Sequence, residues 1–264
     1  MERGAFYYPL YVKDISLFGG EDSQAKPNLS VKAQTYLTEL IQQEPSEVLK
    51  SMAEALFFHT LAILHAPTYR KENSGALQQD WPRVPLPTSA AALQDSAALG
   101  HQIAALLDPE AEVSGVTTGT IHPELRFIAI LRHSAGRPIN PATDDLAVTA
   151  GWGYLINEET VTMPGQGKLV KRDDNAYDIL LNDVSYWEHV PQAVWEYTLG
   201  GYPVLKKWLS YREQKVLGRD LHPEEARTFT EIARRIAALL DLQGDLDRNY
   251  QAVKQNLYTW GTNA

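Results

Sequence analysis

The chain has 264 residues, 44% of them hydrophobic and 22% charged; this ordinary globular usage excludes disorder, collagen or a coiled-coil array as a description of the whole chain. It contains no cysteine, which excludes disulfides, thiolate metal sites and cysteine nucleophiles and favours the reduced cytoplasm as its location. Its net charge of −9 disfavours wholesale wrapping of nucleic acid, although an acidic protein can still carry a local basic face.

The N-terminal stretch shows no signal for export or membrane insertion. The first ten residues lack the long apolar run of a signal peptide. No later stretch approaches ~18 consecutive apolar residues, so no membrane span is predicted. Residues 6–20 mix aromatic residues with proline and glycine and are predicted to form an extended arm or partial strand, followed by a polar loop over 21–28.

Residues 1–110 are otherwise predicted to be helical. Apolar residues recur at spacings of three and four, which is the period of one buried helix face. The predicted helices are 30–43, 45–65 and 89–107, with Thr88 or Ser89 as the cap of the last. A short helix broken by Gly75 is expected within 68–80. The three prolines of 81–87 require an extended connection.

The middle of the chain, residues 111–200, changes character because glycines recur throughout it. Strands are predicted to concentrate between residues 125 and 198. The candidate strands are Phe127–Leu131, Tyr154–Ile156, Thr160–Met163, Lys168–Val170 and Tyr177–Leu181. The sequence Met163–Lys168 is typical of a hairpin turn.

Helices return in residues 201–264, where they are predicted over 203–215 and 224–241, the second being the last long helix. Trp208 and Leu209 are expected to pack the first of these helices against its neighbours. The predicted fold is therefore α+β. A helical part (1–110) frames a strand-rich recognition part (111–200), and the C-terminal helices (201–264) close over it.

Catalytic and cofactor motifs are missing from the sequence. Its seven histidines form no i, i+4 pair, so capping or a satisfied core position is the favoured interpretation over a metal site. Neither a nucleophile elbow nor a phosphate-binding loop is present. Gly151-Trp152-Gly153-Tyr154 is more typical of a turn or bulge than of a dinucleotide site. No catalytic residue, metal or cofactor is predicted for this chain.

Two passages resemble a known family. The first consists of residues 55–70, which begin Ala55-Leu56-Phe57-Phe58-His59, and residues 79–87, which end Val84-Pro85-Leu86-Pro87. The second is Trp195-Glu196-Tyr197-Thr198-Leu199-Gly200-Gly201-Tyr202-Pro203, continuing to Arg212. Together they resemble the C-terminal specificity region of single-polypeptide (type ISP) restriction–modification enzymes and related adenine-N6 DNA methyltransferases. Tyr8-Pro9-Leu10-Tyr11 is similar to the junction between the methyltransferase core and that region.

The resemblance implies a target-recognition domain, either separated from the other modules or encoded apart from them. Nuclease, ATPase and methyltransferase segments precede this region in the family and are missing from this sequence. Adenine methylation with S-adenosylmethionine would then be the parent enzyme's chemistry. The chain also lacks the Pro-Pro base-gripping loop of amino-methyltransferases. Double-stranded DNA and the methyltransferase and nuclease modules are the implied partners.

Charge clusters indicate where DNA would bind. Gly200–Arg219 holds five basic residues against the single acid Glu213, and 125–143 holds three arginines and no acid. Arginine, asparagine and glutamine have donor geometry suited to base edges, whereas lysines suit phosphates. A solvated charged face is the alternative interpretation of each cluster. The predicted DNA-binding residues are Arg132, Arg137, Asn140, Gln166, Lys168, Lys171, Arg172, Tyr202, Lys206, Lys207 and Arg212.

Within this set, Arg132 and Arg137 are expected to read bases, and Lys206, Lys207 and Arg212 to contact phosphates. Two alternatives remain open. The helices within 30–108 could instead dock on a methyltransferase core with little intrinsic DNA affinity, which the acidic balance favours. A small hydrolase using Asp144, Asp145 and a histidine is the other, although two acids after Pro141 are more simply a turn and helix cap.

Overall fold

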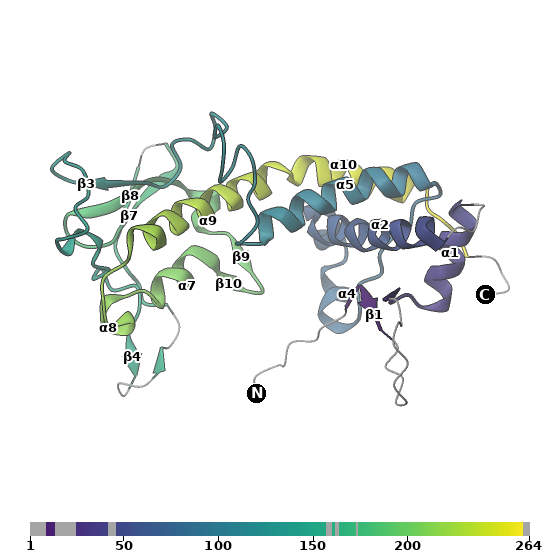
Figure 1. Ribbon diagram of the computed structural model, residues 1–264, viewed down its shortest axis with the longest axis horizontal. Helices are drawn as coiled ribbons and strands as arrows, with labels where there is room; N and C mark the ends of the chain where they lie inside the picture. Colours follow the sequence, from purple (N-terminus) through teal and green to yellow (C-terminus); the bar gives the residue numbers. More distant parts are fainter. Residues whose placement is uncertain are drawn as a thin grey trace. The chain divides into compact units, whose positions relative to one another are not determined.

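The fold is described from a computed structural model covering residues 9–13, 25–41, 46–156, 160–161, 164–172 and 174–260. The chain forms two compact units (Figure 1). The first unit combines residues 1–104 with 242–264, and the second comprises residues 105–241. The predicted three parts, bounded near residues 110 and 200, describe sequence character rather than spatial grouping and stay a prediction.

Helices dominate the first unit. They are α1 (Val31–Ile41), α2 (Ser46–His65), α3 (Pro67–Glu72), α4 (Ser74–Gln79), α5 (Ala90–Leu107) and α10 (Gln243–Gln255), with the last residues of α5 belonging to the second unit. Strand β1 (Tyr11–Val12) pairs antiparallel with β2 (Lys26–Pro27). The helices predicted over 45–65 and 89–107 are confirmed, and the Ser89 hydroxyl caps α5 by accepting the Ala92 N–H at 3.2 Å.

The core of the first unit lies between α1, α2 and α5. Tyr36 and Leu37 are fully buried against Met52 and Leu93. Buried His59 bonds the Ser96 hydroxyl at 2.7 Å and the Pro85 carbonyl at 2.9 Å. Burial lowers the pKa of His59. This histidine is thus a satisfied core residue, as predicted, and it ties the proline-rich connection to the helices.

Three expectations for the first unit were wrong. Helix 68–80 breaks at Asn73 and not at Gly75, which lies inside α4. The predicted polar loop 21–28 contains β2, which pairs with β1. Helix α10 was not expected, since its sequence is mostly polar. Its buried residues are Leu246, Tyr250 and Val253, spaced four and three apart, so one apolar face was present in the sequence.

A four-stranded antiparallel sheet organises the second unit. Its strands are β3 (Ile130–His133), β6 (Leu169–Lys171), β7 (Ala176–Leu180) and β8 (Ser185–Pro191), in the order β3-β8-β7-β6. Separately from this sheet, β4 (Leu155–Ile156) pairs antiparallel with β5 (Thr160–Val161), and β9 (Thr198–Leu199) with β10 (Tyr202–Pro203). Strands do concentrate between residues 125 and 198, as the glycine pattern predicted.

The helices of the second unit follow the sheet in the chain, and aromatic side chains pack some of them against β8. They are α6 (Gln192–Trp195), α7 (Val204–Ser210), α8 (Gln214–Leu217) and α9 (Pro223–Asp241). Trp187 of β8 stacks on Phe229 of α9 with ring centroids 4.0 Å apart, and Trp208 of α7 meets Phe229 edge-on at 5.6 Å. Leu209 is fully buried. The α+β class and the packing role of Trp208 and Leu209 are confirmed.

Two local predictions for the second unit were wrong. Residues 203–215 do not form one helix: α7 ends at Ser210 and α8 begins at Gln214. Residues 164–168 are not a hairpin turn, because β5 pairs with β4 whereas β6 pairs with β7. Gly165 and Gly167 instead donate their N–H groups to Trp152 and Gly151. Met163 lies outside the described residues.

No helix among the described residues combines the length and apolarity that crossing a membrane requires.

Candidate nucleic-acid interface

The predicted DNA-binding residues all lie in the second unit but on different elements. Arg132, Lys171 and Arg172 lie on or next to the sheet, whereas Arg137 and Asn140 lie in the loop after β3. Gln166 and Lys168 belong to the exposed connection before β6. Tyr202, Lys206, Lys207 and Arg212 lie on β10, α7 and the segment after α7. The structure therefore divides the set and does not gather it at one point.

The arginines of the sheet face carry acidic partners. Arg132 Nε donates to Glu188 Oε2 at 3.0 Å. Arg172 bonds both oxygens of Asp178 at 3.2 Å and lies 3.7 Å from Glu188. The hydrogen bond to Asp178 raises the pKa of Arg172. Lys168 likewise pairs with the exposed Asp183 at 3.1 Å. This face is thus a network of mutually neutralised charges with little net attraction for phosphate.

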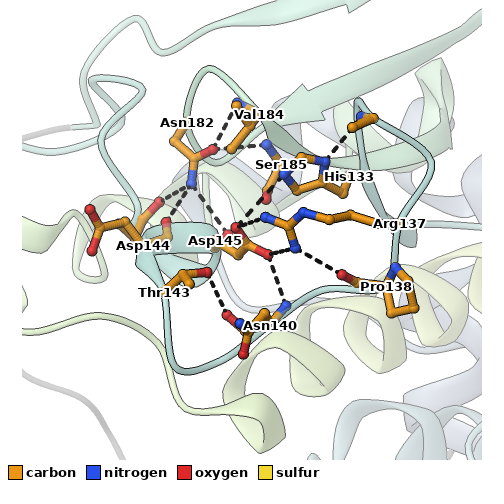
Figure 2. Close-up of polar contacts among 12 residues, drawn as sticks. His133, Arg137, Pro138, Asn140, Thr143, Asp144, Asp145, Asn182, Val184 and Ser185 are labelled. Atoms are coloured by element: carbon orange, nitrogen blue, oxygen red, sulfur yellow. Dashed lines mark hydrogen bonds and ion pairs between the residues drawn. The ribbon is translucent and has the colours of Figure 1, made fainter.

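The loop after β3 is organised around the buried carboxylate of Asp145 (Figure 2). Arg137 holds it with two hydrogen bonds of 2.6 and 2.7 Å, and the backbone N–H of Asn140 donates to it at 2.8 Å. The Arg137 contact, as the largest cause, holds the pKa of Asp145 well below its usual range. Two of the five Arg137 donor hydrogens point at Asp145, and a third reaches the Pro138 carbonyl at 3.0 Å.

A second side chain, Asn182, closes the same loop from the opposite side (Figure 2). Its amide nitrogen donates to the carbonyls of Asp144 and Ala147 at 3.1 and 2.8 Å, and its carbonyl accepts the N–H groups of Val184 and Ser185. Asn140, predicted to contact DNA, uses its side-chain oxygen to accept the Ala142 N–H at 3.1 Å. The loop is therefore fixed by internal hydrogen bonds.

The hydrolase alternative is not supported by this geometry. His133 Nε2 lies 3.7 Å from Asp145, and Ser185 is the cross-strand partner of His133. However, His133 Nδ1 already accepts the Ala135 N–H at 3.0 Å, and the Ser185 side chain is buried with no hydrogen-bond partner. A general base needs a free nitrogen facing an accessible nucleophile. Asp145 acts here as the partner of Arg137.

Helix α7 and its neighbours differ from the sheet in their charge. We call the group of Tyr202, Lys206, Lys207 and Tyr211 the α7 surface. The ammonium of Lys207 lies 4.6 Å from the ring centre of Tyr211 and 5.6 Å from that of Tyr202. Both tyrosines are about half exposed. Within the described part of the chain, neither lysine of this surface forms an ion pair with an acid.

Arg212, the remaining predicted residue, packs inward from this surface. Its guanidinium carbon lies 3.9 Å from the centre of the Trp208 ring, and its Nη1 donates to the Trp208 carbonyl at 3.3 Å. Burial lowers the pKa of Arg212. Glu225 approaches its Nε at 4.0 Å. Its contacts are those of an arginine that stabilises the α7–α9 packing.

Sequence reasoning missed Glu213, which it counted only as one acid in a basic stretch. Its side chain is buried and accepts N–H groups from Gly151 at 3.1 Å, Trp152 at 2.8 Å and Gly153 at 3.4 Å. The turn predicted at 151–154 is therefore bound to the start of α8. Glu213 lies about 60 residues after Gly151 and Gly153, so no local sequence pattern indicates that they are in contact.

The second unit as a whole is acidic: 14 Lys and Arg against 20 Asp and Glu give −6. The lysines of the α7 surface, which have no acidic partner among the described residues, therefore stand out from the charge of the rest of the unit. Among the described residues, no group of three or more His, Asp or Glu side chains is arranged to hold a metal ion.

Comparison with known proteins identifies the family. The family model described as "Type ISP C-terminal specificity domain" matches residues 1–242. The chain belongs to this family. The match to this type ISP specificity domain covers the second unit and residues 1–104 of the first, and it ends just before helix α10. No curated protein sequence matches it significantly.

Two solved structures are similar to this type ISP specificity domain. One is a nuclease-deletion mutant of the type ISP restriction–modification enzyme LlaGI with a DNA substrate mimic, at 13% identity and a TM-score of 0.45 over 73% of this chain. The other is a DrdV–DNA complex, at 17% identity and a TM-score of 0.46 over 87% of this chain. The aligned region covers 13% and 20% of those longer chains.

Proposed function

We propose that this type ISP specificity domain binds a specific duplex DNA sequence on behalf of a restriction–modification enzyme. The observation that carries the proposal is the α7 surface: within the described chain its lysines have no acidic partner, in a unit whose net charge is −6. Lysine side chains without acidic partners suit phosphate contacts, which position a protein on DNA without reading its sequence.

Base reading falls to other groups in this proposal. Lys171 and Gln166 are exposed near the edge of the sheet. Arg132 is also exposed but would have to exchange Glu188 for a base. Arg137 retains two donor hydrogens outside its bonds to Asp145 and Pro138. We propose that the loop after β3 contributes through its fixed shape, with Arg137 chiefly holding that shape.

The chemistry of modification is assigned to other modules. The parent enzyme's methyltransferase would supply adenine methylation and the S-adenosylmethionine site, and its nuclease module would supply cleavage. In this proposal the present chain contributes target choice and no catalytic group.

The alternative is a docking module for such modules with little DNA affinity of its own, which the acidic net charge favours. Titration of the 264-residue chain with random-sequence duplex at two salt concentrations separates the two. Binding that weakens steeply with salt supports DNA recognition, because phosphate contacts release counterions. No binding at low salt contradicts the proposal and favours docking.

A further inference from the structure

We propose that Glu213 is a positioning residue for DNA recognition, which joins Tyr154 to the α7 surface as one contact surface. This inference rests on the proposed function, since it names further residues at the same interface. It is carried by a buried carboxylate, a close backbone contact and a group of exposed tyrosines, all within the second unit.

The first observation is the environment of the Glu213 carboxylate. Its side chain is almost fully buried, and three consecutive N–H groups of residues 151–153 point at its oxygens. Successive backbone N–H groups of this kind form an anion-binding concavity. Here the anion comes from the protein itself, 60 residues further along the chain. Burying a carboxylate is costly unless such donors satisfy it, so the contact specifies one placement of the turn.

The second observation is that the turn is held from its other sides as well. Gly165 and Gly167 donate to the carbonyls of Trp152 and Gly151 at 2.6 and 3.0 Å. The indole of Trp152 donates to Leu180 at 2.7 Å. A Cβ added to Gly153 would lie 1.9 Å from the Ser210 carbonyl oxygen, so only glycine allows this approach to the end of α7.

The third observation is what these contacts place at the surface. Gly153 is followed by Tyr154, and Ser210 by Tyr211, so the close contact lies between two tyrosines that are 47% and 45% exposed. Leu155, which begins β4, is also exposed. On duplex DNA, an exposed tyrosine offers a hydroxyl and an apolar ring for contacts with base edges, and a neighbouring lysine can contact phosphates. Glu213 therefore fixes Tyr154 relative to Lys207 and Tyr211.

The test uses Glu213→Gln in the full chain. A role of the negative charge alone and a role in positioning Tyr154 predict different changes in DNA binding for this variant. The probes are the duplex that the wild-type chain enriches from a random pool and a scrambled version of it. If Glu213 contributed only its negative charge, the variant would bind both duplexes more tightly. If it positions Tyr154, preference for the enriched duplex falls about tenfold, the discrimination expected of one good contact. The matched control is Glu196→Gln, which removes an exposed acid of the same unit and should leave that preference unchanged.

A second variant keeps the proposal testable if Glu213→Gln does not fold, as judged by thermal melting. Tyr154→Ala leaves the carboxylate contacts intact and should lower the preference to a similar extent, whereas Phe127→Ala, another exposed aromatic, should not. An unchanged preference in Tyr154→Ala, or tighter binding of both duplexes by Glu213→Gln, overturns the inference. If the proposed function itself is wrong, the wild-type chain will show no preference for either duplex, and this result is distinct from both outcomes above.

Discussion

Replacing both lysines of the α7 surface by alanine tests whether they contact phosphates. Each phosphate contact contributes about 0.9 to the slope of log affinity against log salt concentration. The Lys207 ammonium already lies 4.6 Å from the centre of the Tyr211 ring and 5.6 Å from that of Tyr202, so little further ordering of this side chain is needed when a phosphate binds. Loss of both contacts should lower the slope by about 1.8, so that between about 50 and 200 mM salt the wild-type chain loses about twelvefold more affinity than the variant.

Fluorescence anisotropy with a labelled random duplex measures this slope. The matched control is Lys32→Ala with Lys71→Ala, which removes the same charge from the first unit. The double α7 variant should bind every duplex more weakly, since phosphate contacts do not depend on sequence. A slope equal to that of the wild-type chain would refute the assignment and would mean that both lysines face solvent in the complex.

Three further predictions concern the core, the loop and the cofactor. Phe229→Ala should lower the free energy of unfolding by about 3–5 kcal/mol, because it removes the ring stacked on Trp187. Replacement of the exposed Phe127 by alanine should change it by no more than about 0.5 kcal/mol. Equal losses for the two variants in urea denaturation would contradict the assignment of Phe229 to the core. The lowered pKa of Asp145 stabilises the fold above the unfolded-state pKa of about 3.9, so the difference in urea midpoint between wild type and Asp145→Asn should be largest near neutral pH and shrink below about pH 4. A constant difference would show that the carboxylate charge is immaterial. Calorimetry should detect no S-adenosylmethionine binding to the isolated chain, and a stoichiometric site would place cofactor chemistry here after all.

Long amphipathic helices were the most predictable part of the fold. The helix predicted over 224–241 is α9 (223–241), and its buried residues Phe229, Ala233 and Ile236 recur at the helical period. The region in which strands concentrate was predicted correctly, but the bounds of individual strands and their pairing were not. The expected strand Phe127–Leu131 lies at 130–133 instead, because Ala129 adopts a positive φ of 53° just before β3.

The contacts that define the candidate site were not predictable, because they join residues far apart in the chain. The expected helix 203–215 is interrupted before Glu213, whose carboxylate binds the backbone of residues 151–153. The apolar periodicity of residues 203–215 does not indicate this interruption. Arg137 had the right chemistry for a base contact, but Asp145 was predicted as a turn or cap residue, or as a hydrolase acid, and not as the partner of Arg137. Charge counts identified basic stretches without showing which side chains were already neutralised.

Selection from a random duplex library is the most direct test of the central claim that this domain recognises DNA by sequence. The wild-type 264-residue chain is used as the bait, and the enriched duplex is then titrated against its scrambled version at one salt concentration. Recognition predicts a single enriched motif bound at least about a thousandfold more tightly than scrambled DNA. Enrichment of no motif, with equal affinity for both duplexes, would contradict sequence recognition by this chain.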